Sequence, residues 1–88
     1  MTKRHLIVKN RAGIHTRPAA EIVKRTQKFQ SEITFVKGDM EVNGKSIMGV
    51  ITLGSPYKDE FDMVCEGPDE KELADCIENF FINRFEEG

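Results

Sequence analysis

A histidine and an arginine lie two positions apart in the segment Gly13-Ile14-His15-Thr16-Arg17-Pro18. Apolar residues recur at helical spacing after this segment, so we expect a helix from near Thr16 to about residue 28. His15 would then lie at or beside the N-cap. The first amides of a helix have no partner within it, and the helix dipole favours negative charge there. The spacing therefore predicts that His15 can carry a phosphoryl group.

The same dipole disfavours an imidazolium ion, so we expect His15 to be neutral and to keep a ring lone pair for attack on phosphorus. Arg17 places a cation in the first turn, where helix stability alone favours Asp or Glu. Residues that cost stability without an evident gain tend to mark functional sites. From these residues alone, an ordinary capping histidine beside a solvated arginine is an equally good interpretation.

The run Gly-Ile-His-Thr-Arg-Pro-Ala at residues 13–19 closely resembles the phosphorylation site of HPr, the histidine-containing phosphocarrier family of the bacterial phosphotransferase system. A second run, Lys-Ser-Ile-Met-Gly-Val at residues 45–50, resembles the family's regulatory serine segment at the expected distance. The resemblance extends over essentially the whole chain. Thr16 is a departure, because Ala is more usual there; it leaves the chemistry intact and bears on partner preference.

The resemblance implies that enzyme I phosphorylates a ring nitrogen of His15 and that the group then passes to an enzyme IIA domain. It implies that Arg17 screens charge during transfer and that the backbone of Thr16 and Arg17 binds the phosphate. An HPr kinase/phosphorylase would phosphorylate Ser46, and a transcriptional regulator is a further expected partner. The docking surface implied for enzyme I and IIA comprises Ala20, Lys24, Ile47 and Met48. The chain would be a phosphoryl carrier rather than a turnover enzyme, with no metal or cofactor.

A regulatory binding module is the alternative function. In that interpretation phosphorylated Ser46 docks a controller, or the chain is an HPr-like protein of a nitrogen branch, and sugar transport is secondary. His15 favours the carrier, because a pure regulator would not need it. Without the resemblance, Ser46 is interpreted as an N-cap alone.

Length and composition predict one domain over residues 1–88, 39% hydrophobic and 32% charged. No apolar run approaches the ~18 residues of a membrane span, and the N-terminus does not resemble a signal peptide. We therefore expect a cytoplasmic monomer. Cys65 and Cys76 are expected to be buried thiols, and His5 to have a structural or surface role, because the spacing of these residues does not match a metal site.

Charge is distributed unevenly along the chain. Residues 1–37 hold nine of the 13 basic residues against two acidic ones, a net charge of +7, and the remainder carries −9. No aromatic residues alternate with the basic ones, so we exclude nucleic acid as the partner. The basic region predicts a rim around His15 that suits an acidic protein. A charged face that only water contacts is the alternative.

Hydrophobic spacing predicts the order βαββαβα, with strands at residues 3–9, 31–37, 40–42 and 60–66. A short helix is expected from an N-cap at Ser46 to Gly54. Asp69 with Glu72 is expected to cap a last helix whose apolar stripe runs to Phe85. Strands with one wet side predict an α+β fold with helices on one face of an antiparallel sheet. The resemblance implies an open-faced β-sandwich, four strands covered by three helices.

Overall fold

The computed structural model describes residues 1–9, 11, 13–14 and 16–83. Seven elements occur in this part of the chain. In order they are β1 (Thr2–Ile7), α1 (Thr16–Thr26), β2 (Glu32–Lys37), β3 (Met40–Asn43), α2 (Ile47–Leu53), β4 (Glu60–Glu66) and α3 (Glu70–Ile82). This is the expected βαββαβα order.

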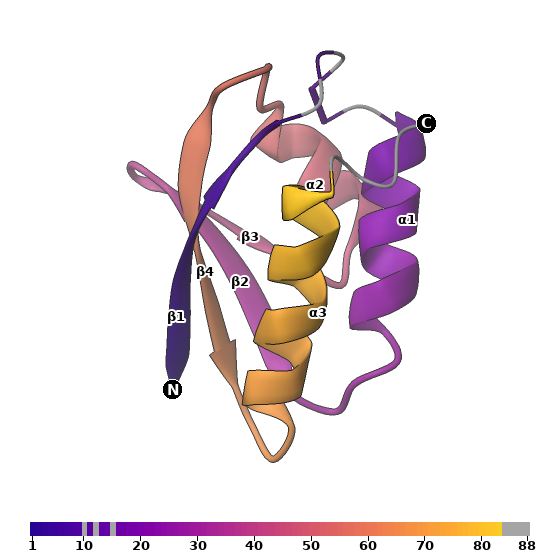
Figure 1. Cartoon of the computed structure of the whole chain (residues 1–88), viewed down its shortest axis with the longest axis vertical. Helices are drawn as coiled ribbons and strands as arrows, with labels where there is room; N and C mark the ends of the chain where they lie inside the picture. The colour runs from indigo at the N-terminus through magenta and orange to yellow at the C-terminus, as the bar shows by residue number, and fades with distance from the viewer. Residues whose placement is uncertain (10, 12, 15, 84–88) are drawn as a thin grey trace.

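The four strands form an antiparallel sheet in the order β1-β4-β2-β3. The three helices lie on one side of it, so the fold is an open-faced β-sandwich (Figure 1). Each strand side that faces the helices is apolar: Phe61, Met63 and Cys65 of β4 are buried, whereas the residues between them are half-buried. The two-residue alternation of these strands thus separates the helix-covered face from the wet face.

Three aromatic rings join the sheet to α3 at the centre of the core. The ring centres of Phe35 and Phe61 are 5.4 Å apart, and those of Phe61 and Phe81 are 5.7 Å apart, both edge-to-face. Ile22 and Val23 of α1 are buried in the same core. The predicted aromatic stripe of α3 is therefore a core face, and it fixes this helix along β1 and β4.

The elements end close to the expected residues, with two corrections. Asp69 occupies the N-cap position of α3 but its carboxylate makes no capping bond to the helix. It accepts instead from the backbone amides of Gln30 and Ser31 at 3.0 and 2.8 Å.

The two cysteines differ in burial. Cys76 is half-buried rather than buried, as was expected for it, while burial raises the pKa of the Cys65 thiol to about 11. Phe85 lies outside the described residues.

The described helices are all too short to cross a bilayer as an apolar span.

Candidate functional site

The backbone just before His15 is held by the segment that follows α2. The Ile14 N–H donates to the Ser55 carbonyl oxygen at 2.8 Å, and the Ile14 side chain is buried. Thr16 is the first residue of α1. His15 itself lies outside the described residues, so its neutral ring and its phosphoryl-accepting role stay predictions. The structure describes the chain on both sides of it.

The first turn of α1 has the features expected of an anion site. It contains no acidic residue, and Thr16 and Arg17 are exposed whereas Pro18 and Ala19 are buried. Pro18 lacks an N–H, which costs little where helical acceptors are absent. The amides of Thr16 and Arg17 have no acceptor within the helix. They are donors that an anion can use at this end of α1.

Basic side chains follow the exposed side of α1. Nη1 of Arg25 donates to Oε1 of Glu21 at 2.9 Å, and the Arg25 guanidinium lies 3.8 Å from the centre of the Phe80 ring. This hydrogen bond is the main cause of the lowered pKa of Glu21, and the charges of Lys24 and Arg17 also contribute. Glu21 is the one acid in α1, whereas Arg17 and Lys24 are exposed. The helix therefore presents a positive surface to solvent.

The expected docking residues lie on α1 and α2, which pack against each other. Ile47 and Met48 have exposed fractions of 43% and 70%, as expected for a two-turn helix that cannot bury every apolar residue. Ala20 is half-buried and Lys24 exposed. The carbonyl of Lys45, just before α2, accepts from the Gln27 side chain just after α1 at 3.3 Å. These two apolar side chains thus lie on a helix next to the basic one.

Ser46 is the N-cap of α2, as predicted. Its Oγ accepts from the Gly49 N–H at 3.1 Å, and its backbone lies in the extended region. The side chain is half-buried. The cap leaves the hydroxyl hydrogen available, and the nearby helix amides favour a negative group there. Ser46 and Ser55 flank opposite ends of α2, so this short helix connects the serine segment with the residue bonded to Ile14.

No sequence motif indicates a role in this region for Ser55, Asp59 or Lys37. Ser55 is buried, and Asp59 forms an ion pair with Lys37 of β2. That pairing is the main cause of the lowered pKa of Asp59. Hydrophobic periodicity cannot reveal this contact between side chains 22 positions apart. Lys37 is the last residue of β2 and Asp59 lies just before β4, so no pattern fixes the direction of either side chain.

His5 lies on the solvent side of the sheet rather than near α1. Its two ring nitrogens face carboxylates of β4, Nδ1 at 2.9 Å from Asp62 and Nε2 at 2.6 Å from Glu60. These contacts raise the pKa of His5, with the Asp62 hydrogen bond as the larger cause. The surface role expected for His5 therefore has a specific form, an imidazole between two acids.

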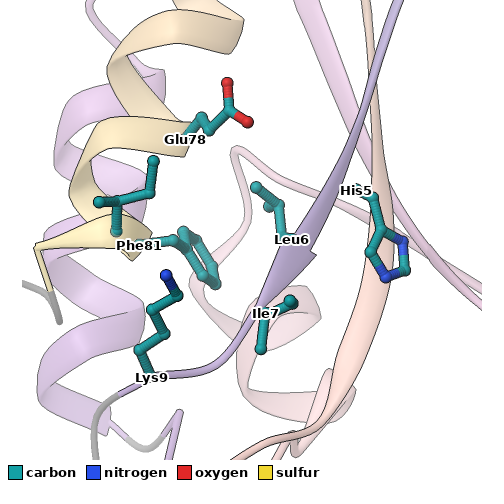
Figure 2. Close-up of a pocket in the computed structure, with 7 residues that line it drawn as sticks. His5, Leu6, Ile7, Lys9, Glu78 and Phe81 are labelled. Atoms are coloured by element: carbon teal, nitrogen blue, oxygen red, sulfur yellow. The ribbon is translucent and has the colours of Figure 1, made fainter.

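A shallow pocket lies between β1 with the residues that follow it and the C-terminal half of α3 (Figure 2). Core side chains of Leu6 and Phe81 border it, together with Lys9 and Glu78. Of the predicted site residues that the structure describes, none lines it. We therefore place the candidate site at the start of α1 and not in this pocket.

Comparison with known proteins finds a family match over most of the chain. The family model described as the PTS HPr component phosphorylation site matches residues 2–83. Over 80 residues the chain is 48% identical to the phosphocarrier protein HPr of Treponema pallidum, with 91% of each chain covered. It is similar to HPr-C-His from Thermoanaerobacter tengcongensis, with a TM-score of 0.95, 35% identity, and coverage of 100% of this chain and 99% of that one. An HPr dimer from the same organism has a TM-score of 0.76 at 35% identity, covering 99% and 100%.

Proposed function

Because the chain belongs to the HPr family of phosphocarrier proteins of the phosphotransferase system, we propose that it accepts a phosphoryl group on His15 from phospho-enzyme I and passes it to an enzyme IIA domain. The observation that carries this proposal is the arrangement around the matched motif. Ile14 is fastened to Ser55, and α1 begins at the next residue after His15 with Arg17 exposed in its first turn.

The transfer step is a displacement at phosphorus between two imidazoles. A ring nitrogen of neutral His15 donates its lone pair to form a new N–P bond. The N–P bond of the donor breaks, and its electron pair returns to the donor ring. The backbone amides of Thr16 and Arg17 and the Arg17 guanidinium stabilise the phosphoryl oxygens during this step.

A carrier must release its group as readily as it accepts it. A deep pocket would stabilise the phosphorylated state and slow the second transfer, because only stabilisation specific to the transition state raises the rate. The start of α1 is exposed and offers one guanidinium and a few amides. Such a site binds a phosphoryl group moderately, which suits reversible transfer.

Partner proteins dock on Ala20, Lys24, Ile47 and Met48 in this proposal. The exposed apolar pair on α2 supplies area to bury, and the basic side chains of α1 attract an acidic partner. Docking brings the two reacting rings together, so that the transfer becomes effectively unimolecular. In this proposal the protein is a cytoplasmic monomer. Size-exclusion chromatography coupled to light scattering tests the monomeric state.

Ser46 is the regulatory site in this proposal. An ATP-dependent kinase of the HPr kinase/phosphorylase type phosphorylates it, and the new charge lies at the start of α2 beside Ile47 and Met48. The cap position tolerates a phosphate with little refolding. Its effect therefore falls on the partners, by weakening the docking of enzyme I.

A second candidate is a regulatory module, favoured by the same half-exposed Ser46 next to exposed apolar side chains. In that case phosphorylated Ser46 docks a transcriptional regulator and the relay is minor. The two functions use different residues and can coexist. The acid stability of the phosphoryl label separates phosphorylation of His15 from phosphorylation of Ser46.

Incubation with phosphoenolpyruvate and enzyme I is expected to give an acid-labile, alkali-stable phosphoryl label that His15→Ala loses. Arg17→Ala should keep the label but slow its transfer about ten- to a hundredfold. A wild-type protein without label contradicts the carrier function.

A serine kinase with ATP should give an acid-stable label that Ser46→Ala loses. Ser46→Asp should slow phosphorylation of His15 by enzyme I. An unchanged rate in Ser46→Asp would show that inhibitory regulation at this site is wrong.

A further inference from the structure

Both ends of the loop that leads to His15 are fastened to one segment of the chain. This segment, residues 54–59, connects α2 to β4, and we call it the bracket. The Val8 N–H donates to the Asp59 carbonyl at 2.9 Å, and the Lys58 N–H donates to the Val8 carbonyl at 2.8 Å. At the other end of the loop, the Ile14 N–H donates to the Ser55 carbonyl at 2.8 Å. The position of the bracket therefore sets where the loop leaves β1 and where it enters α1.

The contact between loop and bracket is tight at Gly13. Its φ is +74°, and a Cβ at this position would come 2.8 Å from the Ser55 carbonyl oxygen and 3.0 Å from Cα of Pro56. Backbone lies against backbone here, so a shift of the bracket must move Gly13 and Ile14 with it. His15 follows at the next position in the chain.

One ion pair ties the bracket to the sheet. The Asp59 carboxylate contacts the Lys37 ammonium at the end of β2, and both side chains are largely shielded from solvent, with exposed fractions of 25% and 32%. The buried Ser55 hydroxyl lies close enough to help lower the pKa of Asp59, although it does not reach hydrogen-bonding geometry. Within the bracket, the Asp59 N–H donates to the Pro56 carbonyl at 3.0 Å. The bracket is thus a closed turn with its charged end anchored on β2.

We propose that Asp59, through its ion pair with Lys37, is a positioning residue for phosphoryl transfer at His15. The inference rests on the proposed function and names residues that the family resemblance did not supply. Asp59 and Lys37 hold the bracket, and the bracket holds the Ile14 amide, so the residue directly before His15 is fixed by a hydrogen bond. A reacting group held in one geometry avoids the entropic cost of finding it, and a displacement of about 1 Å can cost two orders of magnitude in rate.

The test compares Asp59→Asn and Lys37→Met with Asp69→Asn as a matched control. Asp69 is likewise a carboxylate just before an element, bonded to a distant segment, but its partners are Gln30 and Ser31. Three quantities are measured in each variant: kcat and KM for phosphorylation by enzyme I, hydrogen exchange of the Ile14 amide, and stability in urea. The first two report positioning, and the third reports the structural loss common to all three variants.

Asp59→Asn and Lys37→Met should each lower kcat about tenfold with KM within twofold, because the docking residues are untouched. The Ile14 amide should exchange about tenfold faster in both. The double variant should be no slower than either single one, since both remove the same ion pair. Asp69→Asn should lose stability while keeping kcat and the exchange rate of Ile14.

A wild-type kcat in Asp59→Asn overturns the positioning role, and so does an equal loss of kcat in Asp69→Asn. If Asp59→Asn does not fold, Lys37→Met and Gly13→Ala decide the question by the same measurements, because Gly13→Ala displaces the loop from the Ser55 carbonyl directly. An unlabelled wild-type protein would contradict the proposed function instead. Even then, unchanged exchange at Ile14 in Asp59→Asn would independently show that the ion pair does not hold the loop.

Discussion

Different segments meet at the two ends of the sheet (Figure 1), and the hydrogen bonds that join them also differ. At one end, which we call the clamp end, the Asp69 carboxylate joins residues 30 and 31 to the start of α3. The neighbouring Glu70 carboxylate accepts from the Thr2 hydroxyl and from the Gly67 N–H. The Asp69 carboxylate accepts from the amides of Gln30 and Ser31 and from the Ser31 hydroxyl, which in turn accepts from the Asp69 amide at 3.0 Å. At the other end, which we call the loop end, Val8 and Ile14 bind the bracket through backbone hydrogen bonds.

This difference follows from what each end must do. Carboxylates that accept several hydrogen bonds stabilise the clamp end, but the same groups near His15 would repel a phosphoryl group. The carboxylate of the bracket, Asp59, is paired with Lys37, and the first turn of α1 has no acid. In the proposed function, the loop end can therefore accept an anion, while the side-chain hydrogen bonds of the clamp end contribute stability.

The largest effect is expected for Gly67→Ala at the clamp end. Gly67 has φ +148°, and a Cβ there would come 2.6 Å from Oγ and 2.7 Å from Cα of Ser31. Both backbone strain and overlap with Ser31 oppose a side chain, so the free energy of unfolding should fall by about 3 kcal/mol. Urea denaturation followed by circular dichroism measures this loss.

The phosphorylation rate of Gly67→Ala tests whether the loop end works independently of the clamp end. At a temperature where Gly67→Ala is folded, its phosphorylation rate per folded molecule should equal that of the wild-type protein. Gly38→Ala is a suitable control, because no atom lies within 4 Å of a Cβ at that position. A Gly67→Ala protein that folds normally but transfers slowly would show that the two ends are coupled and that their division of roles is wrong.

Two carboxyl groups at the clamp end have lowered pKa values, so acid should weaken this end. Hydrogen bonding lowers the pKa of Asp69, with the Ser31 hydroxyl as the main cause, and that of Glu70 to about 2, with the Thr2 hydroxyl at 2.5 Å as the main cause. A carboxyl whose folded pKa is depressed contributes stability above its unfolded pKa and loses it as the pH falls toward the folded one. The clamp end should therefore weaken between about pH 4.5 and pH 2.

Thermal unfolding of Asp69→Asn against wild type measures this contribution. At pH 7 the midpoint of the variant should be lower by about 8 °C, because the amides of Gln30 and Ser31 and the Ser31 hydroxyl lose an ionised acceptor. At pH 2 the two midpoints should approach each other, because protonation removes the same charge from the wild-type protein. A difference that is independent of pH would mean that the Asp69 charge does not stabilise this end.

The sequence predicts local features of both ends well. Ser46 is the cap of α2 as its pattern indicates, and the alternation of β4 marks its bounds at Glu60–Glu66. These features succeed because the interactions that cause them span only a few residues. Arg17 and the residues expected to dock partners lie on the expected helices for the same reason, but their roles stay predictions. His15 is outside the described residues, and its role also stays a prediction.

Contacts between distant segments could not be predicted in this way. Asp69 followed by Glu72 has the pattern of a helix cap, but Ser31, 38 positions away, competes for the same carboxylate. The Asp69 carboxylate accepts from two backbone amides and one hydroxyl there, so these tertiary hydrogen bonds outweigh the local preference. The Lys37–Asp59 pair is similarly invisible, because its partners are brought together only by the pairing of β2 with β4.

The smallest effect is expected for His5→Gln, on the wet face near the loop end. Protonated His5 donates from both ring nitrogens, to Asp62 and to Glu60, whereas neutral imidazole has only one N–H to donate. These contacts raise the pKa of His5, mainly through Asp62.

A group whose folded pKa is raised contributes stability that is fully present below the unfolded pKa of about 6.5 and is lost as the pH rises through the folded value. His5→Gln should therefore lower the thermal midpoint at pH 6 and not at pH 9. The loss at pH 6 should be only about 2 °C, because Glu60 is exposed and Asp62 only half-buried, so that water screens both pairs. Acid would then weaken the clamp end while alkali weakens the β1–β4 contact near the loop end, and equal loss at both pH values would refute that opposition.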